Sequence, residues 1–128
     1  MVPMVAEEVD RKLSDELVER LIDTGMGKNL AITLVFVAQY GETIGKTIED
    51  NTRLRQPDTS IATRELIRMG LLKKREFPKE GMGRPVFAYS LKKSIDDILR
   101  DIEKGERKKI EELEYNIKRI RELENEIF

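Results

Sequence analysis

The sequence of 128 residues contains no cysteine, no histidine and no tryptophan. Without cysteine there is no disulfide bond, and without cysteine or histidine there is no zinc site built from thiolate or imidazole ligands. The side chain that most often acts as a general base near neutral pH is also missing. Carboxylate pairs such as Asp96 and Asp97 lie beside apolar positions in a charge-rich segment, which indicates a solvated helix face. We therefore expect no enzyme activity, no metal and no cofactor.

Long hydrophobic runs are also scarce. The apolar run from Leu30 to Ala38 is far shorter than the ~20 residues that cross a bilayer. The N-terminal segment MVPMVAEEVDRK has no basic region followed by an apolar stretch, which a signal peptide requires. These features predict a cytoplasmic protein without a membrane partner.

Charge is abundant, because 38% of the residues are Asp, Glu, Lys or Arg, and the net charge is only −1. The two signs are distributed unevenly along the chain. Residues 43–93 contain 12 basic and 6 acidic residues, whereas residues 1–42 and 94–128 have net charges of −4 and −3. A basic middle segment between acidic ends indicates a surface that faces nucleic acid.

Two helices are expected in the N-terminal part. Residues 6–24 carry apolar side chains every four positions and are followed by Gly25, which is typical of an amphipathic helix. Residues 30–40 are apolar nearly all round, so we expect a buried helix with Asn29 as its N-cap. The β-branched residues of this run make a strand the alternative.

Two further helices and a β-hairpin are expected in the middle. Thr43 is a suitable cap for a helix over residues 44–51, and Gly70 closes a helix over 57–69. LLKKREF and VFAYSL, at 72–77 and 86–91, predict two strands around the loop PKEGMGRP.

The C-terminal part, from Ser94 onward, has the apolar spacing of a coiled coil. Steps of three and four residues separate its isoleucines and leucines, and 11-residue steps join the first group to the second. We therefore expect residues 1–93 to form one domain and 94–128 a helical dimerisation segment, which either continues through Gly105 or bends there. The positions expected at the dimer contact are Ile102, Ile110, Leu113, Ile117, Ile120 and Ile127. Packing of this segment back on its own domain is the alternative.

The order helix, short turn, helix, hairpin gives the middle of the chain a resemblance to a known family. ETIGKTIEDNTRLRQPDTSIATRELIRMGLLKKREF and GMGRPVFAYSL are similar to the winged helix-turn-helix of archaeal transcription regulators near the MarR and TrmB families. The resemblance covers about residues 28–91. It implies a winged helix-turn-helix with a small β-hairpin, and a regulator that binds double-stranded DNA. From the resemblance together with the coiled-coil spacing of the C-terminal part, we expect a mainly α-helical fold with a long C-terminal coiled-coil helix, and a homodimer. No effector-binding pattern carries over from the family, so the resemblance leaves the effector unknown.

The residues themselves support the same expectation for the helix over 57–69. An α-helix fits the major groove with its N-terminal residues toward the bases, and short hydroxyl side chains allow close approach. A forked guanidinium such as that of Arg64 suits guanine or a pair of phosphates. The wing over 72–91 is expected on the flanking backbone or in the minor groove. The candidate DNA-binding residues are Lys46, Arg53, Arg55, Gln56, Thr59, Ser60, Thr63, Arg64, Arg68, Lys79 and Arg84.

A winged helix that binds another protein of the transcription or replication machinery is the main alternative function. Its sign would be an apolar rather than basic outward face on the helix over 57–69, for which Ile61 and Ile67 are the residues to inspect. An enzyme would need a metal–carboxylate pocket, and the sequence contains no convergent acidic set.

Overall fold

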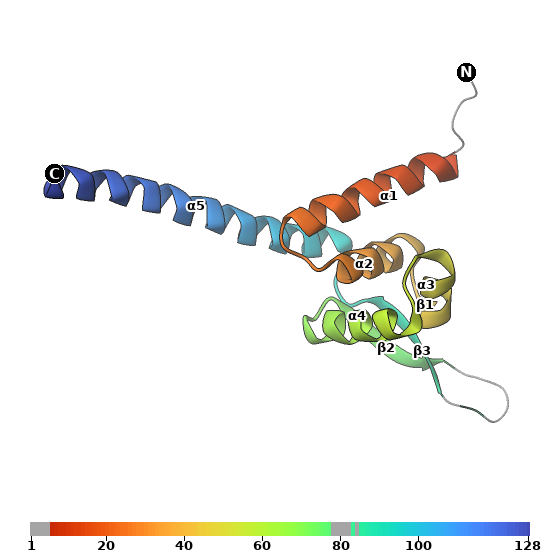
Figure 1. Cartoon of the computed structure of the whole chain (residues 1–128). Coiled ribbons are helices and arrows are strands. Elements are labelled where there is room, and N and C mark those ends of the chain that lie inside the picture. Colours follow the sequence, from red (N-terminus) through yellow and green to blue (C-terminus); the bar gives the residue numbers. More distant parts are fainter. Residues whose placement is uncertain (1–5, 78–82, 84) are drawn as a thin grey trace, which may run out of the picture. The chain divides into compact units, whose positions relative to one another are not determined.

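The computed structural model describes residues 6–77, 83 and 85–128. Its elements follow in the order α1 (Ala6–Asp23), α2 (Lys28–Tyr40), β1 (Thr43–Ile44), α3 (Gly45–Asn51), α4 (Gln56–Arg68), β2 (Leu72–Phe77), β3 (Val86–Leu91) and α5 (Ile95–Ile127) (Figure 1). The chain divides into two compact units, Met1–Ile95 and Asp96–Phe128. The first unit contains seven of these elements and the second contains most of α5.

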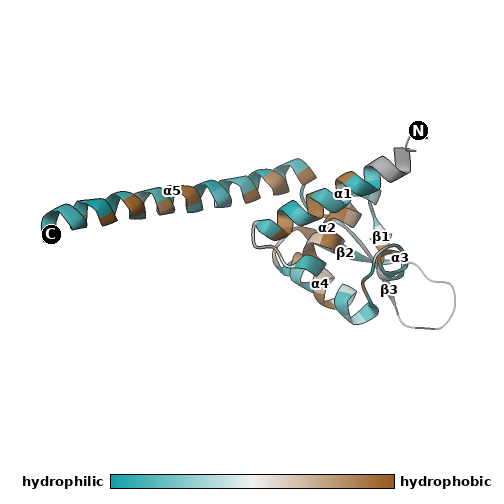
Figure 2. Ribbon diagram, turned by 45° about the horizontal axis from the view of Figure 1, so that its top comes forward, coloured by the Kyte–Doolittle hydropathy of each residue, from teal (hydrophilic) through white to brown (hydrophobic). Residues whose placement is uncertain are grey.

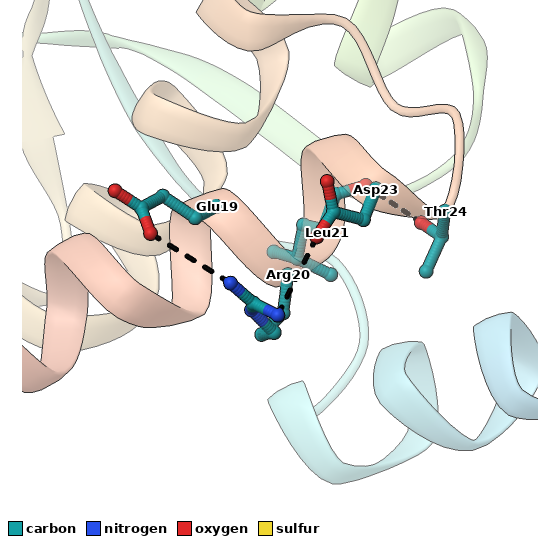
Figure 3. Close-up of polar contacts among 5 residues, drawn as sticks. All are labelled: Glu19, Arg20, Leu21, Asp23 and Thr24. Carbon is teal, nitrogen blue, oxygen red and sulfur yellow. Dashed lines mark hydrogen bonds and ion pairs between the residues drawn. The ribbon is translucent and has the colours of Figure 1, made fainter.

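The end of α1 is fixed by its own last turn, as Figure 3 shows. The hydroxyl of Thr24 donates to the carbonyl of Leu21 at 2.6 Å. The next residue, Gly25, has a φ of 102°, and the N–H groups of Gly25 and Met26 donate to Ile22 and Leu21. This is the pattern of a helix closed by a left-handed glycine. Arg20 lies between two carboxylates, with nitrogens 3.8 Å from Glu19 and 3.6 Å from Asp23.

The core of the first unit forms around α2, which packs against both α1 and α4. Leu34, Val37, Ile48 and Leu66 are at most 1% exposed. The prediction of a helix rather than a strand for the apolar run is confirmed. The apolar stripe of α1 is only partly buried, because Leu21 is 3% exposed while Leu13 is 60% exposed.

Two predicted caps were wrong. The N-cap of α2 is Gly27 rather than Asn29, and the carbonyl of Gly27 accepts the first helical bond from Ala31 at 2.9 Å. Thr43 does not cap α3, because Thr43 and Ile44 form the short strand β1, which pairs with β3. Ile44 is then the extended residue before α3.

The sheet therefore has three antiparallel strands in the order β1-β3-β2, not the hairpin alone. β2 and β3 have the predicted bounds, and their register pairs Leu72 with Leu91 and Phe77 with Val86. Leu72 and Ala88 are each 1% exposed and anchor this sheet in the core. The predicted fold class, mainly α-helical with a small β element, a winged helix-turn-helix and a long C-terminal helix, is confirmed.

α5 is one continuous helix of 33 residues and passes through Gly105 without interruption. Bands of hydrophobic and hydrophilic residues alternate along it in Figure 2. Pairs three or four residues apart, such as Arg100 with Asp96 at 2.8 Å and Arg107 with Glu103 at 3.1 Å, stabilise its surface. This continuity answers the question that Gly105 raised in the sequence.

Candidate nucleic-acid interface

The turn between α3 and α4 is held by local hydrogen bonds. The hydroxyl of Thr52 donates to the carbonyl of Ile48 at 2.7 Å and accepts the N–H of Leu54 at 3.2 Å. Ile48 and Leu54 are 0% and 7% exposed, so the two apolar residues that flank the turn both enter the core. The turn therefore fixes where α4 begins.

The first turn of α4 combines a proline with an acidic residue. Pro57 lies where a missing N–H costs nothing. The carboxylate of Asp58 accepts the N–H of Arg55 at 3.2 Å. At the other end Gly70 has a φ of 78°, and the N–H of Leu71 donates to Leu66 at 2.9 Å. Both ends of α4 are thus fixed by the sequence signals that predicted them, to within one residue.

The outward side of α4 carries polar and basic residues. Gln56, Ser60, Arg64 and Arg68 follow one another at four-residue intervals, and all four are at least partly exposed. Within the described part of the chain, no acidic side chain pairs with Arg64. This arrangement leaves a free guanidinium one helical turn after a small hydroxyl side chain.

Thr59 and Thr63 do not belong to this outward side, which corrects the sequence-based expectation. Each is 2% exposed. The hydroxyl of Thr63 donates back to the carbonyl of Thr59 at 2.9 Å, a bond within the helix. They occupy the inward face beside Ala62 and Leu66, so their side chains are not available to DNA.

Arg68 and Lys46 are exposed but already paired. Nε and Nη2 of Arg68 both donate to the carboxylate of Glu65. These hydrogen bonds lower the pKa of Glu65 and raise the pKa of Arg68. Lys46 lies 3.7 Å from Asp50. Arg53 and Arg55 are exposed in the turn before α4. A phosphate would compete with an acidic neighbour at Arg68 and Lys46, whereas none of the described acidic side chains forms an ion pair with Arg53 or Arg55.

The strand β2 adds basic residues that the sequence analysis did not single out. Lys73, Lys74 and Arg75 are all exposed. The ammonium of Lys74 lies 4.6 Å from the centre of the Phe87 ring, and Arg75 donates to Glu42 at 2.7 and 2.6 Å. Their clustering on one predicted wing strand was the available signal. The two wing-tip candidates, Lys79 and Arg84, lie outside the described residues.

An apolar residue interrupts the polar outer side of α4. Ile61 is 64% exposed, whereas Ile67 is only partly exposed. Beside Ile61 lies a groove of about 420 Å³ whose lining includes Gly27, Leu30, Ala62 and Glu65. The outer side of α4 thus combines the polar and basic row from Gln56 to Arg68 with one exposed apolar side chain, Ile61.

No cluster of three or more potential metal ligands occurs among the described residues. In the same part of the chain, no helix is long and apolar enough to cross a membrane.

Comparison with known proteins gives structural likeness only. No family model and no curated protein matches the chain. The match with the crystal structure of transcriptional regulator PA4135 extends over 98% of this chain and 96% of the PA4135 chain, with a TM-score of 0.53 and 16% identity. The match with the crystal structure of RV1404 from Mycobacterium tuberculosis extends over 87% of this chain and 73% of the RV1404 chain, with a TM-score of 0.49 and 18% identity.

A third similar structure is the homodimeric winged helix-turn-helix DNA-binding domain of Mb0332 from Mycobacterium bovis, a possible ArsR-family transcriptional regulator. It covers 90% of this chain and 95% of its own, with a TM-score of 0.44 and 21% identity. At these identities, the likeness to PA4135 shows a shared fold.

Proposed function

We propose that this chain is a sequence-specific DNA-binding transcription regulator that acts as a dimer, without an enzymatic activity of its own. The observation that carries the proposal is the outer side of α4, where Ser60 is followed by an exposed Arg64 that forms no ion pair with the described acidic side chains. The buried face of α4 packs against α2, α3 and β2, which leaves its other face free for the major groove. The sequence expectation of a regulator near the MarR and TrmB families, located in the cytoplasm, agrees with this proposal.

In the proposed complex, α4 enters the major groove with its N-terminal half toward the bases. Ser60 is short enough for a close approach to base edges or phosphates, the amide of Gln56 suits adenine, and Arg64 suits a bidentate contact with guanine. Lys46, Arg53, Arg55 and Arg68 contact phosphates on either side. The wing formed by β2 and β3 lies on the flanking backbone or minor groove. Lys79 and Arg84, which belong to the sequence between these strands but lie outside the described residues, are further candidates for this contact.

The dimer contact is proposed on α5. The side chains of Ile110, Leu113, Ile117, Ile120 and Ile127 are 52–67% exposed. A second copy would bury these side chains and bring two α4 helices to one DNA molecule, which doubles the contact and reads a two-fold site. Ile102 belongs to the same proposed contact.

The test is an electrophoretic binding assay of the full chain against genomic fragments at a stated salt concentration, followed by footprinting of any bound fragment. We expect one shifted species on a two-fold site and protection of major-groove positions. Arg64→Ala is the informative variant, and Arg119→Ala is its matched control because it removes the same charge from α5. Equal retardation of all fragments, unchanged by Arg64→Ala, would contradict sequence-specific binding.

The second candidate function is contact with another protein through the outer side of α4. The exposed Ile61 and the groove beside it favour this alternative. Ile61→Ser distinguishes the two functions, because Ile61 has no group that reads a base by a hydrogen bond. Loss of a protein partner with unchanged DNA affinity would support the alternative, and loss of DNA affinity would support contact of Ile61 with a thymine methyl group.

A further inference from the structure

The part of α5 between Ile110 and Ile127 carries a row of side chains at coiled-coil spacing, here called the seam. Every position of this row but one is apolar. Ile110, Leu113, Ile117 and Ile120 alternate in steps of three and four residues, and the next two seam positions are Glu124 and Ile127. These are the a and d positions of a coiled coil. The seam therefore contains one carboxylate among five apolar side chains.

This carboxylate distinguishes the two possible directions of a helix pair. In a parallel pair in register, each a position faces the same position of the second copy, so two Glu124 carboxylates would share one layer. Like charges that are drawn from water and face each other are unfavourable. In an antiparallel pair, a positions face d positions, and the register that uses the whole seam places Ile110 opposite Ile127. Glu124 then faces Leu113, and the two carboxylates lie ~16 Å apart along the axis at ~1.5 Å per residue.

We propose that α5 pairs with a second copy of this chain in antiparallel direction, with Ile110 opposite the partner's Ile127 and Ile117 opposite the partner's Ile120. This inference rests on the proposed dimer and specifies its geometry. In this register Ile102 lies outside the paired segment, so the inference narrows the proposed dimer contact to the seam between Ile110 and Ile127.

The charges that flank the seam agree with this register. Glu114 and Arg121 are both e positions, and e positions face each other in an antiparallel pair. The proposed register places Glu114 opposite the partner's Arg121, twice by symmetry. A register shifted by seven residues would instead place Glu114 opposite the partner's Glu114, and Arg121 opposite the partner's Arg107. Each helix already holds Arg121 3.2 Å from Glu124, so one guanidinium would lie between two carboxylates.

A parallel pair also has one favourable charge contact, between Lys109 and Glu114 of the second copy. Lys109 already binds Glu106 of its own helix at 2.8 Å, just as Arg121 binds Glu124, so the flanking charges do not decide between the two directions. Surface ion pairs of this kind contribute little, whereas two facing carboxylates in the seam oppose pairing directly. The carboxylate of Glu124 in the seam is therefore the observation that favours the antiparallel direction.

The absence of native cysteine allows a direct test by disulfide cross-linking of the full chain. The variants are Ile110→Cys and Ile127→Cys, examined singly and after mixing and re-equilibration of the two. We expect a cross-linked dimer only in the mixture. In the proposed pair, position 110 of one copy lies ~25 Å from position 110 of the other, far beyond the ~4 Å between Cβ atoms of a disulfide. Rapid cross-linking of Ile110→Cys with itself would overturn the antiparallel direction.

Charge reversal provides the matched control, because it leaves the apolar seam intact. Glu114→Arg and Arg121→Glu should each raise the dimer dissociation constant about tenfold, and the double variant should restore it. In a parallel pair, the side chain at position 121 faces the partner's Asn116, so Arg121→Glu would have little effect. The double variant would then not recover the dimer affinity that Glu114→Arg loses. Sedimentation measures all three variants.

The outcomes separate this inference from the proposed function. A monomeric wild-type chain in sedimentation would overturn both the dimer and its direction, while the DNA-binding assay would still test α4. A dimer that cross-links in the parallel pattern would overturn only the direction.

Discussion

At the scale of single residues, Arg64 provides the most direct test of the proposed function, because it is exposed on α4 and unpaired among the described residues. Arg64→Ala should cost about 1–3 kcal/mol of affinity for the specific site and relax its sequence preference. Arg84→Ala, in the sequence between β2 and β3, should weaken binding to all DNA sequences similarly. Fluorescence anisotropy with specific and random duplexes measures both. If Arg64→Ala reduces the two affinities equally, Arg64 contacts only phosphate.

The ion pair between Glu42 and Arg75 gives a pH dependence at the same scale. The hydrogen bond from Arg75 lowers the pKa of Glu42 below its ordinary value of 4.5. A lowered folded-state pKa stabilises the fold above that ordinary value, and the contribution is lost as the pH falls through the folded-state pKa. Glu42→Gln should therefore lower the thermal midpoint slightly at pH 7 and leave it unchanged near pH 2. A difference that persists at low pH would show that the glutamine itself disturbs the loop.

The sequence predicted which residues form α4 more easily than which face of the helix each side chain occupies. The spacing of Thr59 and Thr63 fits both the inward and the outward face, because threonine is small enough to be buried and polar enough to be exposed. Only the contacts of α4 with α2 and β2 decide between the two faces. Arg64 was predicted outward and lies there, since a guanidinium is buried only when paired.

At the scale of elements, helix and strand bounds were predictable wherever local signals coincide. β2 and β3 have the expected bounds because glycine and proline punctuate the loop between them, and α4 differs by one residue at each end. β1 was missed because its two residues are extended only through pairing with β3, more than 40 positions away. Local propensity carries no information about such a partner.

The continuity of α5 through Gly105 leads to a stability prediction. A glycine inside a helix destabilises it by roughly 0.5–1 kcal/mol relative to alanine, and a Cβ added at Gly105 would meet no atom within 4 Å. Gly105→Ala should therefore increase protection of α5 amides in hydrogen exchange while the amides of α2 remain unchanged. A loss of protection in α5 would indicate that Gly105 accommodates a close neighbour in the assembly.

At the scale of the whole molecule, the segregation of charge leads to a salt prediction. Residues 43–93 have a net charge of +6 in a chain of net charge −1. If the dimer engages roughly 6–10 phosphates, its affinity for DNA should fall ~10³–10⁵-fold between about 50 and 200 mM salt. Binding titrations at several salt concentrations measure this slope. A flat response would contradict the DNA-binding function.

Removal of α5 tests the division of the chain into a DNA-binding part, residues 1–93, and a dimerisation part, residues 94–128. Truncation after Leu99 should give a folded monomer with weaker DNA binding, because the core around α2 is retained and the second half-site contact is lost. Sedimentation equilibrium gives the mass, and circular dichroism confirms folding. A truncated chain that remains dimeric would move the contact elsewhere, and the exposed Leu13 of α1 is then the first position to examine.

The strand order β1-β3-β2 leaves β2 at the edge of the sheet, with one row of backbone N–H and C=O groups unpaired within the described sheet. Such an edge is a template on which other chains can assemble into aggregates. Four consecutive charged residues, Lys73 to Glu76, occupy this strand, and charged side chains on an edge oppose that assembly. If β2 contacts the phosphate backbone as proposed, Lys73, Lys74 and Arg75 have a second role in opposing intermolecular sheets. Neutralising these three together would then change the solubility of the protein as well as its affinity for DNA.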